Sequence, residues 1–152
     1  MRYRTRLARA LDAAGIDIDA RVIFLPAMRH DRYLAVNTVC DAMLDTMRWS
    51  GGNTSLDAIA AGLPIVTLPG RFMRARQSAA MLRLMGVDEL VAADAAGYLD
   101  IASRIAGDRG WRDRQAGLIV ANRARIFDDP QPVPALHAAI ERLLPEAKAR
   151  FG

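Results

Sequence analysis

One segment in the first half of the chain constrains the fold more than any other. The apolar run Ala42-Met43-Leu44 leads into the glycine pair Gly51-Gly52, and a helix-like segment from Ser55 to Ala61 follows. Gly62 is the expected end of that helix, and a second strand-like run, Ile65 to Leu68, comes directly after it. A strand, a glycine loop, a helix and a second strand in this order predict a parallel α/β unit.

The same alternation continues along most of the chain. Further strands are expected over residues 22–25 and 90–92, and further helices over residues 4–14, 29–39, 74–85, 95–106, 111–126 and 134–150. This order predicts an α/β fold, a Rossmann-like parallel sheet flanked by helices. The chain opens on a helix, whereas this architecture ordinarily opens on a strand, so we expect that its first strand is missing.

Length and helix-breaking residues predict how the chain is organised. With 152 residues it is long enough for one ordinary core and too short for two full α/β domains. The stretch Asp128-Asp129-Pro130-Gln131-Pro132 is linker-like. We therefore expect one Rossmann-like domain over residues 1–127, with a linker and a helix over residues 128–152 that pack on the same domain.

Composition indicates a globular cytoplasmic protein. The chain is 52% hydrophobic and 25% charged, and its apolar runs are too short to cross a membrane. The basic start leads into a charged segment rather than the apolar core of a signal peptide. The net charge is +4, but the arginines are scattered among acidic residues, so neither a membrane nor a nucleic acid is an expected partner.

Cysteine and histidine usage argues against a metal centre. The single cysteine, Cys40, excludes an internal disulfide and a cysteine-cluster metal site. We interpret it as an inert packing residue, with a nucleophile as the alternative. The two histidines are far apart in the sequence, and no cluster has metal-ligand spacing, so no metal is expected.

The glycine loop is the candidate binding site. Glycines let the backbone approach a phosphate closely, and the first amides of the following helix point at it together with the positive end of the helix dipole. Ligands of such sheets bind outside the carboxyl ends of strands, where the loop after Asp45 is expected. Asp57, one turn into the helix, is placed to meet ribose hydroxyls. The spacing indicates a nucleoside diphosphate site, in particular one for a nucleotide sugar.

Several motifs in one order resemble a known family. They are the run from Arg21 to Pro26, the pair Asp41 and Asp45, the loop from Gly51 to Asp57, the run from Ala61 to Gly70, and Arg76 with Ser78. Together they are similar to the C-terminal catalytic region of O-GlcNAc transferases, of SPINDLY-type protein O-glycosyltransferases and of their bacterial relatives. The resemblance covers most of the chain, from Ala10 to Ile126.

The resemblance implies a GT-B glycosyltransferase, of which this sequence matches only the half that binds the donor nucleotide. The implied donor is a nucleoside diphosphate sugar, UDP-GlcNAc, with no metal or other cofactor, and the implied acceptor is a protein or other hydroxyl. The other partner is the missing N-terminal catalytic half, so the catalytic residues stay unassigned and the chain alone is expected to be inactive. A non-catalytic nucleotide-binding or interaction module is the alternative. An edge strand left exposed by the missing segment would favour a homodimer.

The resemblance also assigns roles to individual residues. The loop amides and side chains would hold the diphosphate, Asp57 the ribose, and the backbone near Met28 the base. Tyr33 would stack on the base, and His30 would touch a phosphate when protonated. The implied nucleotide-binding residues are Met28, His30, Tyr33, Gly51, Gly52, Asn53, Thr54, Asp57 and Arg76.

Plain structural roles remain open for several of these residues. Asp57 can simply favour the first turn of its helix through the dipole. Tyr33 can be a half-buried helix aromatic, His30 a surface histidine and Arg76 a solvated arginine. We interpret Asp45 as a strand-end residue that caps the loop backbone rather than as a catalytic base.

Overall fold

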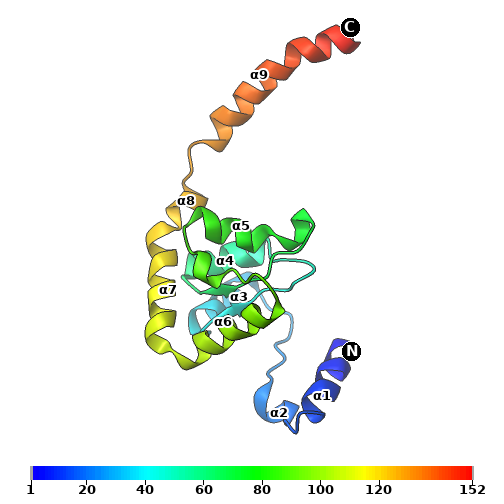
Figure 1. Cartoon of the computed structure of the whole chain (residues 1–152), viewed down its shortest axis with the longest axis vertical. Helices are drawn as coiled ribbons and strands as arrows, with labels where there is room; N and C mark the ends of the chain where they lie inside the picture. The colour runs from blue at the N-terminus through cyan, green and yellow to red at the C-terminus, as the bar shows by residue number, and fades with distance from the viewer. Residues whose placement is uncertain (1, 152) are drawn as a thin grey trace. The chain divides into compact units, whose positions relative to one another are not determined.

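The computed structural model describes residues 2–151. The chain packs as two compact units, Met1–Tyr33 and Leu34–Gly152 (Figure 1). The boundary between them falls inside the range expected for one domain. Among the described residues, none of the helices is long and apolar enough to cross a membrane.

The first unit is helical and contains no paired strand among its described residues. Helices α1 (Arg2–Asp12) and α2 (Ile18–Arg21) contact each other, and α3 (His30–Val39) begins in this unit. Arg4 of α1 links these helices, because its guanidinium forms an ion pair with Asp19 of α2 at 3.1 Å. The same guanidinium lies 5.0 Å from the ring centre of Phe24.

The expectation of a buried strand over residues 22–25 is wrong in this structure. No strand pairs with this segment in the described part of the chain, and Ile23 and Leu25 are 86% and 55% exposed. An extended apolar segment becomes a strand only when a neighbouring strand takes up its backbone hydrogen bonds. The apolar run predicted the composition of a strand but not the presence of that neighbour.

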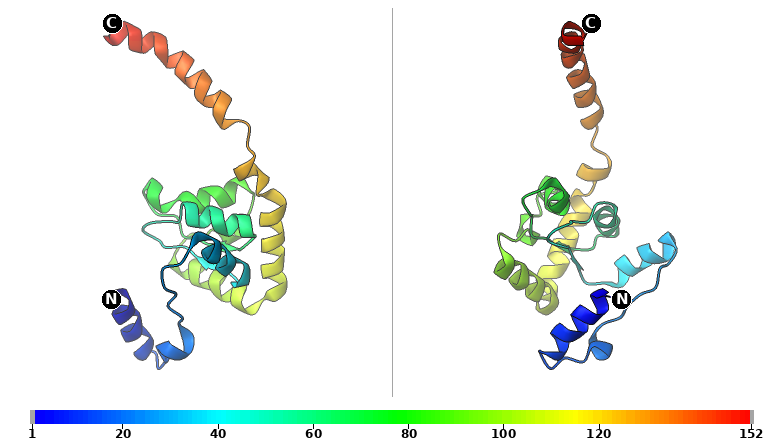
Figure 2. Two further views of the ribbon diagram at one scale, coloured as in Figure 1. Left: turned by 180° about the vertical axis from the view of Figure 1, so that it is seen from behind. Right: turned by 90° about the vertical axis from the view of Figure 1, so that its right-hand side faces the viewer.

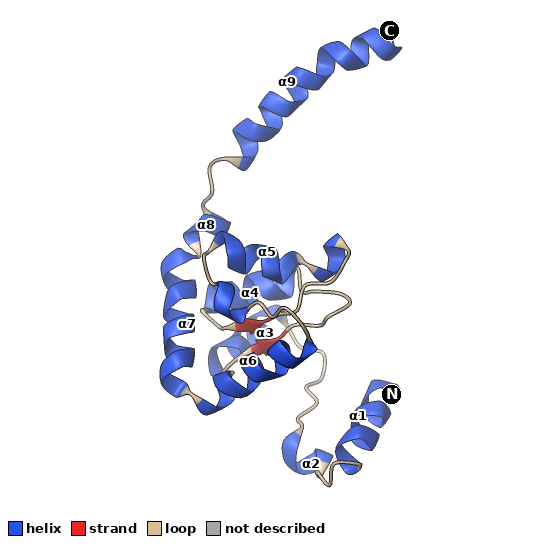
Figure 3. Cartoon of the chain, viewed as in Figure 1, coloured by secondary structure: helices blue, strands red, loops and turns tan. Residues whose placement is uncertain are grey.

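The second unit holds the parallel sheet, drawn in red in Figure 3. Strands β1 (Met43–Leu44) and β2 (Ile65–Val66) are parallel, with Met43 opposite Ile65. The strand expected over residues 90–92 is reduced to a single parallel bridge between Thr67 and Val91. This confirms the α/β prediction, although the sheet is small and most of the unit is helical.

Helices make up most of the second unit, and several of their bounds follow local signals in the sequence. They are α4 (Asn53–Ala61), the 3-10 turn η1 (Met73–Ala75), α5 (Gln77–Leu84), the 3-10 turn η2 (Asp88–Leu90), α6 (Ala95–Gly107), α7 (Arg109–Asn122), α8 (Ala124–Phe127) and α9 (Pro132–Phe151). Gly62 ends α4 at a φ of 75°, as expected of a glycine cap. The two longer helices expected over residues 74–85 and 111–126 are each divided, at Arg76 and at Arg123.

The core lies between the sheet and the helices around it. Ile59 of α4, Ile65 of β2 and Ile119 of α7 are all fully buried. Trp111 of α7 is 2% exposed and belongs to the same cluster, so it anchors its helix to the core. Figure 1 and the left view of Figure 2 show α7 along one side of this unit. The packing of residues 128–152 on the domain stays a prediction.

Candidate functional site

A buried carboxylate organises the loop that follows β1. Asp45 is 4% exposed and lies directly after the strand. Its Oδ1 accepts the backbone N–H groups of Thr46 at 3.0 Å and Gly51 at 2.8 Å. Its Oδ2 accepts the hydroxyls of Ser50 and Thr67, both at 2.7 Å. Asp45 therefore caps the loop backbone, as the sequence indicated, and also ties the loop to the residue after β2.

Three buried serines extend this network to α4 and α5. The Oγ of Ser78 lies 2.8 Å from the Oγ atoms of both Ser50 and Ser55, and all three residues are at most 1% exposed. The single hydroxyl proton of Ser50 goes to Asp45. Ser78 must therefore donate to Ser50, and Ser55 to Ser78. The hydroxyls form a directed chain from Ser55 on α4 to the carboxylate of Asp45.

Sequence reasoning did not find this serine network. The resemblance includes Ser78 without giving it a role, Ser55 enters only with the motif from Gly51 to Asp57, and Ser50 is not among the predicted site residues. The sequence feature that could have indicated the network is a set of small hydroxyl residues close to Asp45, the acidic residue at the end of a predicted strand. The network satisfies polar groups that would otherwise be buried without partners.

The loop after β2 packs against the glycine loop. The backbone N–H of Ser50 donates to the carbonyl oxygen of Arg74 at 2.8 Å. A Cβ on Gly70 would lie 2.7 Å from the Cβ of Ala75 and 3.3 Å from the carbonyl oxygen of Met47, so this position needs a glycine. The two loops lie together at the edge of the second unit opposite α7 (Figures 1 and 2).

The start of α4 presents free backbone donors. The N–H groups of Ser55 and Leu56 both donate to the carbonyl oxygen of Gly52. Within the described residues, the N–H groups of Gly52, Asn53 and Thr54 donate no hydrogen bond. These are the groups that a helix N-terminus leaves for an anion, and the dipole of α4 adds partial positive charge there.

Steric contacts explain the glycine at position 51. Its φ is negative, so the backbone conformation does not require glycine. A Cβ built there would overlap the Oγ of Ser55 and lie 2.7 Å from the Oγ1 of Thr54. A Cβ on Gly52 would lie 2.9 Å from the Oε1 of Gln77, at the start of α5. Gly51 therefore lets the loop lie directly on the first turn of α4, whereas at Gly52 the nearest atom belongs to the end of the flexible Gln77 side chain, which can move aside.

The structure brings most of the predicted site residues together. The loop residues and half-buried Asp57 occupy the first two turns of α4 and the residues before it. Arg76 is exposed and directly precedes Gln77, the residue that approaches Gly52. Together with Met73, Gln77 and Ala80, Arg76 lines an open cavity of about 360 Å³.

The predicted base-side residues lie in the first unit. The rings of His30 and Tyr33 stack at the start of α3, with their centres 6.3 Å apart and an angle of 29° between them. Met28 and Tyr33 are half-buried, and His30 is exposed. Their roles toward a base or a phosphate stay predictions. Cys40 is exposed, so the expectation that it packs in the interior is wrong, and its inertness stays a prediction.

Among the described residues, no group of three or more histidine, cysteine or acidic side chains is placed to hold a metal ion.

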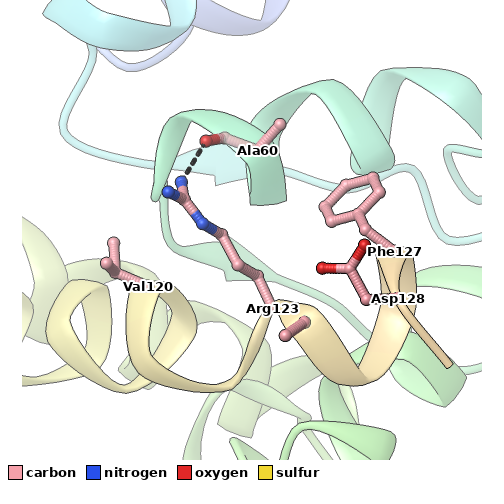
Figure 4. Close-up of a pocket in the computed structure, with 6 residues that line it drawn as sticks. Ala60, Val120, Arg123, Phe127 and Asp128 are labelled. Atoms are coloured by element: carbon pink, nitrogen blue, oxygen red, sulfur yellow. Dashed lines mark hydrogen bonds between the residues drawn. The ribbon is translucent and has the colours of Figure 1, made fainter.

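The cavity in Figure 4 lies at the other end of α4 and is separate from the glycine loop. It measures about 420 Å³ and is lined by Ala60 of α4, by Val120 of α7, and by Arg123, Ala124, Phe127 and Asp128 in and around α8. Arg123 donates from Nη1 to the carbonyl oxygen of Ala60 at 2.6 Å. This contact satisfies a carbonyl group in the last turn of α4, where a positive charge complements the helix dipole.

The chain is similar to proteins described as UDP-N-acetylglucosamine–peptide N-acetylglucosaminyltransferases. A UDP-N-acetylglucosamine–peptide N-acetylglucosaminyltransferase of Giardia intestinalis is 30% identical over 117 residues, which are 74% of this chain and 8% of that protein. A probable SPINDLY transferase of the same description from Solanum lycopersicum is 28% identical over 107 residues, 69% of this chain and 11% of that protein. The chain thus spans a small part of these relatives.

A solved structure and a family model agree with these relatives. A mutant O-GlcNAc transferase of Thermobaculum terrenum matches 97% of this chain and 29% of its own, with 33% identity and a TM-score of 0.83. The model of glycosyl transferase family 41 matches residues 4–128. The chain therefore belongs to glycosyl transferase family 41, and its α/β unit corresponds to part of a GT-B catalytic region.

Proposed function

We propose that this chain is the donor-nucleotide-binding half of a glycosyltransferase. In this proposal it binds a UDP-linked sugar of the GlcNAc type, and the sugar is transferred to a hydroxyl of a protein or other acceptor. The observation that carries the proposal is the set of free N–H groups of Gly52, Asn53 and Thr54, held in place by the buried Asp45 network. The descriptions of its relatives as UDP-N-acetylglucosamine–peptide transferases support the choice of donor.

Each group at the site has a task in donor binding. The three free N–H groups donate to diphosphate oxygens, and the positive end of α4 favours their charge. The carboxylate of Asp57 accepts hydrogen bonds from the ribose hydroxyls. Arg76 supplies a guanidinium that suits phosphate oxygens. The roles that the resemblance gives to Met28 and Tyr33 toward the base, and to protonated His30 toward a phosphate, stay predictions.

The loop acts on the leaving group of the reaction. As the bond between the sugar and the diphosphate breaks, its electron pair passes to the phosphate oxygen, and negative charge grows on the diphosphate. Donors already fixed in position stabilise that charge without reorganising. The base that removes the proton of the acceptor hydroxyl comes from an N-terminal half, which also supplies part of the acceptor site in this proposal.

Calorimetric titration of the chain with UDP, with GDP for comparison, tests the donor site. We expect saturable binding of UDP and weaker binding of GDP. Asp57→Ala should weaken UDP binding by about tenfold, on the order of one charge-assisted hydrogen bond. Asp100→Ala removes an exposed carboxylate from α6 and should leave UDP binding unchanged.

One result would contradict this proposal, and another would favour the alternative to it. The absence of UDP and GDP binding at millimolar concentration would contradict a donor site in this chain. UDP binding by a chain that never supports transfer, even with an added N-terminal half of a relative, would favour the non-catalytic binding module.

A further inference from the structure

Large apolar side chains are exposed on the two loops beside the start of α4. Trp49 on the first loop is 70% exposed, and on the second loop Phe72 and Met73 are 56% and 76% exposed. Soluble proteins rarely leave several such side chains in water at one place unless they bind something there. Aromatic residues and arginine are the residue types enriched at protein interfaces.

Arginines accompany these side chains. The guanidinium groups of Arg71 and Arg74 lie 5.8 and 4.8 Å from the ring centre of Phe72. Two cations therefore form cation–π contacts with the same aromatic ring. Arg48 precedes Trp49 on the other loop. We call this surface the arginine–aromatic patch; its members are Arg48, Trp49, Arg71, Phe72, Met73 and Arg74.

The patch lacks negative charge of its own. In the described part of the chain, no carboxylate forms an ion pair with Arg48, Arg71 or Arg74. The sequence has no acidic residue between Asp57 and Asp88. Two guanidinium groups on one ring repel each other, and an anionic partner removes that repulsion. The charge of the patch therefore complements an acidic ligand.

We propose that the arginine–aromatic patch binds an acidic segment of the acceptor polypeptide, and as an acceptor site it rests on the proposed function. The carboxylates of the segment pair with Arg71 and Arg74, whose planar groups suit bidentate contacts. Its apolar side chains pack on Trp49, Phe72 and Met73. Because the backbone N–H of Ser50 bonds to Arg74 O at 2.8 Å, the patch adjoins the loop that leads to the free amides. A segment held there has its hydroxyls beside the donor.

Peptide binding to the full chain, followed by fluorescence anisotropy, tests this proposal. One labelled peptide carries serine and leucine flanked by aspartate and glutamate, and its matched control carries asparagine and glutamine instead. We expect the acidic peptide to bind about tenfold more tightly, and high salt to remove the difference. The double variant Arg71→Ala/Arg74→Ala should weaken acidic-peptide binding roughly three- to tenfold, on the order of two exposed ion pairs.

A control variant with the same change in charge is Arg83→Ala/Arg142→Ala, which removes two exposed arginines from α5 and α9 and should not alter peptide binding. Equal affinity for the two peptides would overturn the proposal. So would an unchanged affinity in the Arg71→Ala/Arg74→Ala variant. Tighter binding of a single-stranded oligonucleotide than of the acidic peptide would overturn it in favour of nucleic acid.

Titration of the same proteins with UDP separates this proposal from the proposed function. Arg71→Ala/Arg74→Ala should weaken peptide binding and keep UDP binding, and Asp57→Ala should do the reverse. UDP binding without discrimination between the peptides overturns the patch proposal alone. Discrimination between the peptides without UDP binding overturns the proposed function and supports the acidic docking surface.

Discussion

The backbone N–H of Gly51 donates to Oδ1 of Asp45 at 2.8 Å, which fastens the glycine loop to the end of β1. The other carboxylate oxygen accepts the hydroxyl of Thr67, the residue after β2, at 2.7 Å. The position of the loop, and with it the start of α4, therefore depends on one buried side chain. Residues that touch no ligand in our proposal thus control where the free amides point.

Asp45→Asn should destabilise the protein and weaken UDP binding together. The new amide group would face N–H and O–H donors that now bond to a carboxylate, so at least one buried donor loses its partner. We expect a loss of about 2–3 kcal/mol in the free energy of unfolding, measured by urea denaturation. Asp100→Asn, an exposed change on α6, is the control. A loss below about 0.5 kcal/mol, as at an ordinary surface site, would contradict the anchoring role of Asp45.

Gly51→Ala should be destabilising, although the φ of this residue is not positive. The added methyl group would overlap the Oγ of Ser55 and push the loop away from α4. We expect a cost of about 1–3 kcal/mol, as for overpacking, and weaker UDP binding. Gly117→Ala is the matched control, because nothing lies within 4 Å of its Cβ and it is inside α7. That change should stabilise the protein by up to about 1 kcal/mol, and similar effects of the two substitutions would refute the steric argument.

Tyr98 predicts a loss of stability at alkaline pH. Its hydroxyl donates to the carbonyl oxygen of Asp45 at 3.0 Å. Burial, and then the negative charge of Asp45, raise the pKa of the Tyr98 phenol above its ordinary value of 10.0. Its contribution to stability is therefore complete below pH 10.0 and is lost as the pH rises through the raised pKa.

Urea midpoints of the wild type and Tyr98→Phe between pH 8 and about 11 measure this effect. At pH 8 the wild type should have a higher urea midpoint than Tyr98→Phe. This difference between the two midpoints should shrink as the pH rises. Tyr3→Phe, at a 72% exposed tyrosine, should follow the wild type throughout. Parallel pH profiles of the wild type and Tyr98→Phe would count against the prediction.

The pKa of Glu89 predicts a loss of stability in acid. The hydrogen bond from Nε1 of Trp111, 2.9 Å long, is the main cause that lowers the pKa of Glu89 below its ordinary value of 4.5, and Gln115 adds to it. This contribution to stability is present above pH 4.5 and is lost as the pH falls through the lowered pKa. Urea denaturation should show the advantage of the wild type over Glu89→Gln shrinking between pH 6 and about 3. A constant difference across that range would show that the hydrogen bond does not distinguish the two charge states of Glu89.

Local signals in the sequence were sufficient for α4 and its surroundings. The apolar runs predicted the two parallel strands, and Gly62 predicted the end of the helix, because left-handed backbone at that position favours glycine. The glycine pair predicted a loop directly before the helix. These properties depend on neighbouring residues, so a sequence contains them without reference to the rest of the chain.

Only the tertiary structure decided which residues that are distant in the sequence contact each other. Residues 22–25 have the composition of a strand but find no strand to pair with in the described chain. Ser55 and Ser78 are 23 positions apart, and nothing in their local sequence indicates that their hydroxyls meet at 2.8 Å. A hydrogen bond needs its two atoms within about 3 Å, and only the packing of α4 and α5 against the sheet brings them that close. The sequence by itself determined which segments form the unit and where the glycine loop lies; folding in three dimensions determined what holds that loop in place.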